Sequence, residues 1–73
     1  MFVGIDTEKG EMFVNINSIH LISDTMNDEN KCLMFIQGLN DGIIVNEGYE
    51  SLKDRMSSGD YLLNGQHHYR HLH

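Results

Sequence analysis

Histidines are the residues whose type and spacing most suggest chemistry, because four of the five lie in the last seven positions of the chain. His67 and His71 would share a face of a helix, whereas His67, His71 and His73 would share a face of a strand. Neutral imidazoles bind Zn²⁺, Ni²⁺ and Cu²⁺ well. These three histidines are therefore the candidate metal ligands.

The surroundings of these histidines weaken the case for a dedicated metal site. A structural zinc site usually has four ligands, and residues 66–73 supply no cysteine or carboxylate to complete one. Incidental metal affinity is therefore favoured, a disordered end or one added for expression comes second, and a physiological site comes third. No cofactor is expected.

A second set of residues could bind a small ligand such as a nucleotide. Tyrosine rings could stack on a base, and nearby Lys or Arg side chains could hold phosphates, although aromatic residues at these spacings are more often part of a core. The candidate ligand-binding residues are Tyr49, Lys53, Arg55, Tyr61, Tyr69 and Arg70.

Residue combinations that would support catalysis are absent from the sequence. No G-x-S-x-G, G-x-G-x-x-G or phosphate-loop motif occurs. His20 lies in an alternating apolar segment, where a solvent-facing or backbone-bonded imidazole is favoured over a catalytic base. Cys32, the only cysteine, lies in the apolar run 32–36, where a thiol usually behaves as a small buried hydrophobe. We expect a protein that is not an enzyme.

Charge also limits the partners. Eleven Asp and Glu against five scattered Lys and Arg give a formal net charge of −6, which disfavours binding to a nucleic-acid backbone. The N-terminus lacks the basic and apolar segments of a secretory signal, and no run approaches the roughly 20 apolar residues that span a bilayer. The expected location is the cytoplasm, or the host cytoplasm if the protein is encoded by a phage.

The elements that must position these residues are mainly strands. Short β-branched and aromatic segments alternate with turn-forming Gly, Asn and Asp. The sequence predicts a mainly β (α+β) fold, either a small antiparallel β-meander or an SH3-like barrel of about five strands, with one short C-terminal helix. The expected strands are 2–5, 12–15, 19–23, 31–37 and 43–46, with a bend or single helical turn near 15–18 and a helix over about 48–57.

The chain divides by composition into residues 1–59, which form the β-meander or barrel with its helix, and residues 60–73. Asn64-Gly65 is a two-residue hairpin signal, so the His-rich end is either a hairpin or a flexible tail. A 73-residue chain has a thin core, and a single cysteine excludes a disulfide within the chain. Assembly into a homo-oligomer is therefore expected.

The order of these segments resembles the small flagellar proteins of the FlbD type. The residues that carry the resemblance are Met12-Phe13-Val14-Asn15, Ile19-His20-Leu21-Ile22, Gly42-Ile43-Ile44-Val45 and Glu47-Gly48-Tyr49-Glu50-Ser51-Leu52. The resemblance covers roughly residues 8 to 56 and is one of architecture. That family's role as a small accessory or regulatory factor implies a binding function, and no functional residue is carried over.

Two functions follow as expectations. The first is a small interaction protein that docks on a larger protein and regulates or inhibits it, in a bacterium or in a phage that infects one. Exposed strand edges could add to a partner's sheet or pair with a second copy. The alternative is an oligomeric receptor or sequestering protein for a small ligand, with pockets between subunits.

Overall fold

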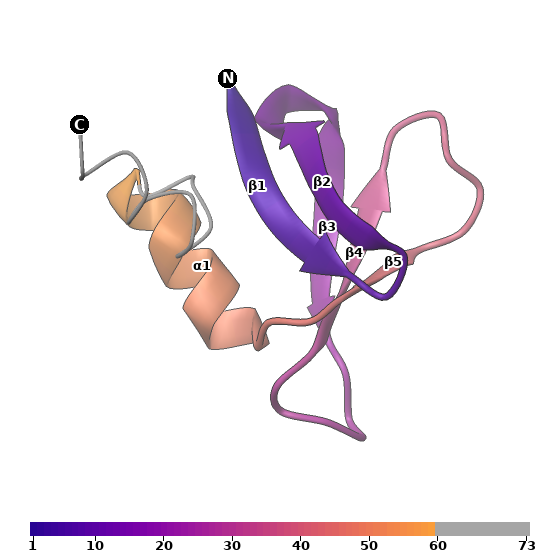
Figure 1. Ribbon diagram of the computed structural model, residues 1–73, viewed down its shortest axis with the longest axis vertical. Helices are drawn as coiled ribbons and strands as arrows, with labels where there is room; N and C mark the ends of the chain where they lie inside the picture. The colour runs from indigo at the N-terminus through magenta and orange to yellow at the C-terminus, as the bar shows by residue number, and fades with distance from the viewer. Residues whose placement is uncertain (60–73) are drawn as a thin grey trace.

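The computed structural model describes residues 1–59. It confirms the mainly β prediction, with five strands in one antiparallel sheet and one short helix after them (Figure 1). The elements are β1 (Phe2–Thr7), β2 (Gly10–Asn15), the 3₁₀ helix η1 (Ile16–Ser18), β3 (Ile19–Asp24), β4 (Cys32–Ile36), β5 (Ile43–Val45) and α1 (Tyr49–Ser58).

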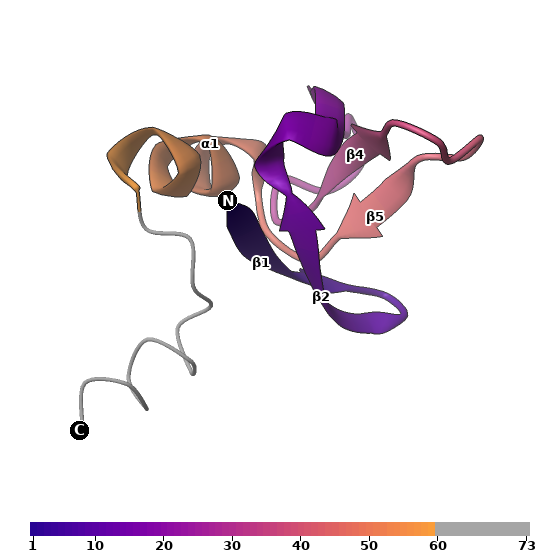
Figure 2. The ribbon, with the colours of Figure 1, turned by 90° about the horizontal axis from the view of Figure 1, so that it is seen from above.

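The strands do not follow chain order across the sheet. Their order is β2-β1-β5-β4-β3, so the β1–β2 hairpin and the β3–β4–β5 meander are joined through pairing of β1 with β5. That junction is short, with Thr7 opposite Val45. The sheet ends at β2 on one side and at β3 on the other, and α1 lies beside it, next to β1 in Figure 2 and in contact with β3.

Alternation along the strands forms the core. Val3 faces Val14 across β1 and β2, and Met34 faces Ile43 across β4 and β5, as expected when every second side chain points to the same face. From α1, Leu52 is fully buried against this face. The buried apolar residues are Val3, Ile5, Val14, Cys32, Met34, Ile36, Val45 and Leu52.

The predicted interruption between the second and third strands is confirmed as η1. Asn15 caps this single turn, because its side-chain oxygen accepts a hydrogen bond from the backbone N–H of Asn17 at 3.0 Å. Asn favours such a local bond over a continuous strand ladder. The turn separates β2 from β3, which become the two edges of the sheet.

The helix begins and ends at glycines. Gly59, with φ of 81°, closes α1 by donating its backbone N–H to the Arg55 carbonyl, as glycine often does beyond a helix C-terminus. Gly48 precedes the helix, and a Cβ at this position would lie 2.5 Å from the Glu29 carbonyl oxygen. The β3–β4 loop therefore packs directly against the start of α1.

Cys32 and His20 are placed as the sequence predicts. The Cys32 side chain is fully buried, and burial, together with the nearby Glu47 and Asp24 carboxylates, raises the pKa of its thiol to about 11. Since the thiolate is the reactive form, this thiol is inert near neutral pH. The His20 side chain is exposed on β3.

Only α1 is an α-helix among residues 1–59, and its ten residues are too few and too polar to cross a bilayer. The predicted C-terminal hairpin or tail over residues 60–73 lies outside the described residues.

Candidate functional site

An apolar surface covers the face of the β3–β4–β5 meander that points away from the core. We call this surface the outer apolar face, and it consists of Leu21, Leu33, Phe35 and Ile44. Leu21 lies opposite Phe35, and Leu33 lies opposite Ile44. The side chains therefore form a continuous patch across three strands, in which Leu21 is 52% exposed and Ile44 is 36% exposed.

Glycine shapes one side of this patch. The Phe35 ring covers Gly42, where an added Cβ would lie 3.0 Å from the ring. His20 flanks the same ring, with 6.5 Å between the two ring centroids. The Phe35 ring therefore lies over Gly42 and beside His20, and Phe35 is partly exposed next to Leu21.

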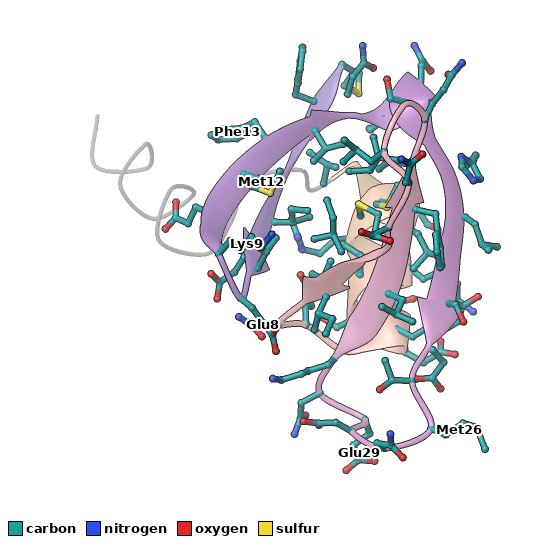
Figure 3. All side chains as sticks on the ribbon, turned by 90° about the vertical axis from the view of Figure 1, so that its right-hand side faces the viewer. Glu8, Lys9, Met12, Phe13, Met26 and Glu29 are labelled. Carbon is teal, nitrogen blue, oxygen red and sulfur yellow. The ribbon has the colours of Figure 1, made fainter. Side chains whose placement is uncertain are left out.

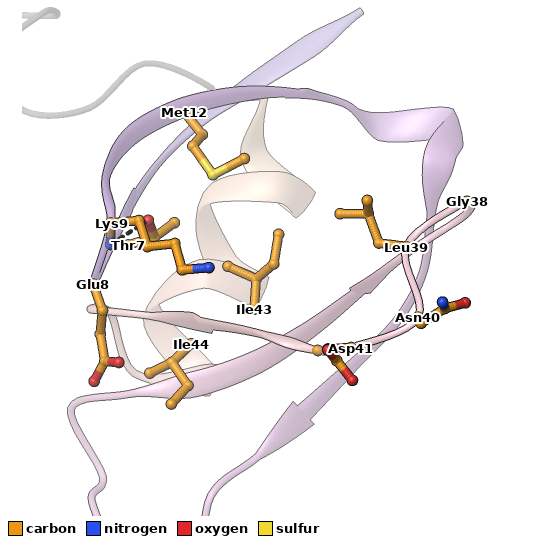
Figure 4. A pocket seen from close by; sticks show the side chains of 11 residues that line it. Thr7, Glu8, Lys9, Met12, Gly38, Leu39, Asn40, Asp41, Ile43 and Ile44 are labelled. Atoms are coloured by element: carbon orange, nitrogen blue, oxygen red, sulfur yellow. Dashed lines mark hydrogen bonds between the residues drawn. The ribbon is translucent and has the colours of Figure 1, made fainter.

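A pocket of about 560 Å³ opens between the β1–β2 turn and the β4–β5 loop. Figure 4 shows the side chains of Met12, Leu39 and Ile43 pointing toward one another across it, with the Lys9 ammonium entering from the turn. Ile44 also lines the pocket, but it points away from the centre, toward the outer apolar face. The pocket and the face are thus neighbouring features.

Hydrogen bonds in the β1–β2 turn fix the position of Lys9. Thr7 donates its hydroxyl to the Gly10 carbonyl at 2.7 Å and accepts the Lys9 backbone N–H at 3.1 Å. Next to it, Glu8 pairs with Lys31 of the β3–β4 loop at 3.4 Å. Lys9 forms no ion pair with any residue of 1–59, so its ammonium is the available cation of the pocket.

The candidate ligand-binding residues Tyr49 and Lys53 come together on α1. The Lys53 ammonium lies 5.3 Å from the centroid of the Tyr49 ring and 3.3 Å from a Glu50 carboxylate oxygen. A hydrogen bond from Lys53 to Glu50 and the charge of Glu50 raise the pKa of Lys53. Tyr49 also packs against the core, so its ring serves the fold as well as the surface.

Arg55, the third candidate on α1, is engaged within the fold. Its guanidinium donates to both carboxylate oxygens of Glu47, at 2.8 and 3.0 Å, and to the Gly4 carbonyl of β1 at 2.8 Å. The Arg55 side chain is only 12% exposed. A phosphate would have to displace these bonds, so Arg55 holds α1 against the sheet.

The remaining predicted site residues lie outside the described residues. These are the candidate ligand-binding residues Tyr61, Tyr69 and Arg70 and the candidate metal ligands His67, His71 and His73. Within residues 1–59, no group of three or more His, Cys, Asp or Glu side chains is arranged to hold a metal ion.

Sequence reasoning missed both the outer apolar face and the pocket. The segment 32–36 is apolar at five successive positions, so it presents apolar side chains to both faces of the sheet. Only one of these faces is covered by the core. The run of five apolar residues is therefore the sequence signal that could have indicated an exposed apolar surface. The pocket joins residues about 30 positions apart, and no local pattern indicates that contact.

Comparison with known proteins provides no relative from which to transfer a function. No protein-family model, curated protein or solved structure matches the chain. The resemblance to FlbD-type proteins therefore stays a prediction, and the function must be argued from the geometry alone.

Proposed function

We propose that this protein is a non-enzymatic binding protein that docks on a larger protein through the outer apolar face and thereby regulates or inhibits it. One observation carries the proposal: Leu21, Leu33, Phe35 and Ile44 form a continuous, partly exposed apolar patch on an otherwise acidic protein. An apolar patch with a polar rim is typical of protein interaction sites.

The shape of the patch supports docking. Phe35 provides an aromatic ring that packs over Gly42, and aromatic anchors contribute strongly to protein interfaces. Removing the remaining exposed surface of Leu21 and Ile44 from water would favour association by roughly 25 cal/mol per Å² of apolar area. The patch is therefore suited to form the centre of an interface.

The edge of the sheet adds a second mode of contact. β3 pairs with β4 on one side only, and its other side is an edge of the sheet. The register shifts between Ile19 and Leu21, a bulge that disturbs the first part of this edge. A partner strand would therefore pair beside Leu21–Asp24, next to the outer apolar face.

A capture experiment tests this function. The full-length protein, immobilised and exposed to a bacterial lysate, should retain a partner that the double variant Leu21→Asp/Ile44→Asp loses. Met26→Asp is the matched control, because Met26 is 98% exposed at the tip of the β3–β4 loop, away from the face (Figure 3). Capture that is equal for all three proteins would contradict docking through this face.

The proposal also specifies where the partner would be found. The partner would be a cytoplasmic protein of a bacterium, or of a bacterial host if a phage encodes the chain. Docking would act by covering a functional surface of that partner. Homo-oligomerisation is compatible with this function but not required by it.

The pocket favours a second candidate function, a receptor or sequestering protein for a small ligand. Its apolar lining by Met12, Leu39 and Ile43 and the single ammonium of Lys9 suit a small molecule with an apolar body and an anionic group. A thermal-shift screen of nucleotides tests this candidate. Stabilisation that is lost in Lys9→Ala would support it, and no shift at millimolar nucleotide would count against it.

A further inference from the structure

The segment that carries the outer apolar face is acidic. The segment 19–45, which contains β3, β4 and β5, has four carboxylates and a single lysine. The carboxylates are Asp24, Asp28, Glu29 and Asp41, and the lysine is Lys31. No Lys or Arg occurs between residues 10 and 30.

The cations of the described residues do little to neutralise this charge. Lys31 is paired with Glu8, Lys53 with Glu50 and Arg55 with Glu47. Lys9 points into the pocket (Figure 4). The carboxylates of the meander therefore keep an excess of negative charge.

Two carboxylates, those of Asp41 and Asp6, border the patch. Asp41 directly precedes Gly42, which the Phe35 ring covers. On the β1 side, Glu8 donates its backbone N–H to the Ile44 carbonyl, and alternation along β1 places Asp6 on the same face of the sheet as Glu8. Apolar side chains at the centre are thus bordered by negative charge.

This arrangement distinguishes between the occupants that could cover the face. A second copy of the chain would bring the same apolar patch but also the same acidic border and a net charge of −6, so the two copies would repel each other. A basic partner would place opposite charges over the border while its apolar side chains cover the centre. Charge complementarity of this kind accelerates association and selects the partner.

We infer that the segment that docks on the outer apolar face belongs to a basic partner protein and alternates apolar side chains with Lys or Arg. In an extended segment, the apolar residues would contact Leu21, Phe35 and Ile44, and the basic residues would lie over Asp6 and Asp41. This inference rests on the proposed function and specifies the chemistry of the partner.

Synthetic peptides test the inference directly. A ten-residue peptide that alternates Leu with Lys is titrated into the ¹⁵N-labelled full-length protein and followed by the amide resonances of the outer apolar face. We expect shifts centred on Leu21, Phe35 and Ile44, and an affinity that falls about tenfold between 20 and 300 mM salt. A Leu–Glu peptide of the same pattern should not bind, and a Ser–Lys peptide should not shift this face.

Variants separate the contribution of charge from that of the apolar centre. Asp6→Asn/Asp41→Asn should weaken binding of the Leu–Lys peptide severalfold and reduce its salt dependence, because both positions border the patch. Leu21→Asp should abolish the shifts at the face. Amide spectra of each variant without peptide show whether it is folded.

The outcomes separate failure of the inference from failure of docking. If the Leu–Lys and Leu–Glu peptides shift the face equally, the basic partner is excluded while docking through the face stands. A dimer seen by light scattering and dissolved by Leu21→Asp would show that a second copy is the occupant, and would overturn the inference. If no peptide shifts the face at millimolar concentration, both the inference and the docking face are contradicted.

Discussion

Arg55 of α1 and Glu47, which lies between β5 and α1, form a bidentate ion pair. Arg55 Nη2 lies 2.8 Å from Glu47 Oε1, and the same nitrogen donates to the Gly4 carbonyl of β1. Bidentate Arg–carboxylate pairs are among the stronger polar contacts in proteins. The ion pair positions the Arg55 guanidinium, and the bond from this guanidinium to the Gly4 carbonyl fixes α1 relative to β1.

Loss of this pair should destabilise the fold. Arg55→Ala should lower the free energy of unfolding by roughly 1.5–3 kcal/mol, because it removes bonds to a charged, largely buried carboxylate. Lys53→Ala is the control, since the Lys53–Glu50 pair is exposed and should contribute little. Urea denaturation measures the free energy of unfolding of both variants. An equal loss in Arg55→Ala and Lys53→Ala would contradict a structural role for Arg55.

Acid should weaken the same contact. Burial alone would raise the pKa of Glu47, but hydrogen bonds from Arg55 and Ser51 and the charge of Arg55 lower this pKa below its usual 4.5. A lowered pKa in the folded state stabilises the protein above the unfolded pKa, and this stabilisation is lost as pH falls through the folded value.

Glu47→Gln should therefore reduce the loss of stability between pH 5 and pH 3. Urea midpoints of the wild type and the variant across this range provide the measurement. An identical pH dependence in the two proteins would show that Glu47 is not the group responsible.

A side chain at position 48 should also be costly. In Gly48→Ala, the new Cβ would clash with the backbone carbonyl of Glu29, which is part of the main chain and cannot rotate away. We expect a loss of about 1–3 kcal/mol in thermal or urea unfolding. Asp54→Ala, at an exposed position of the same helix, should change stability by less than about 0.5 kcal/mol. Full stability of Gly48→Ala would mean that the loop does not pack as described.

The Cys32 thiol should resist modification in the folded protein. It is fully buried, and its pKa is raised to about 11, so almost none of it is thiolate at pH 7.5. A thiol reagent such as iodoacetamide should react at pH 7.5 only after urea unfolding, as followed by mass spectrometry. Rapid labelling of the native protein would contradict the burial.

Local patterns predicted the elements well but not their arrangement. Period-two segments and turn residues located all five strands and η1, and the Tyr49, Leu52 and Met56 spacing located α1. The sheet order was not predictable, because β1 and β5 meet at Thr7 and Val45, which are far apart in sequence. Pairing of this kind depends on the fold as a whole.

The candidate sites show the same limit. The sites predicted from the sequence rest on residues that can bind metals or stack on a ligand, namely the C-terminal histidines and the tyrosines. The outer apolar face instead consists of ordinary strand residues such as Leu33 and Ile44. Which side of an apolar strand remains exposed depends on what packs against the other side, here Leu52 of α1. No local sequence pattern indicates which face of the strand α1 covers.

The affinity of the captured partner for Ile44→Asp tests the central claim most directly. Ile44 is 36% exposed, so the variant can fold while placing a charge at the centre of the outer apolar face. Isothermal titration calorimetry should show at least a hundredfold weaker binding than for the wild type, or about 2.7 kcal/mol, with Met26→Asp unchanged. Binding of Ile44→Asp within threefold of the wild type would contradict docking through this face.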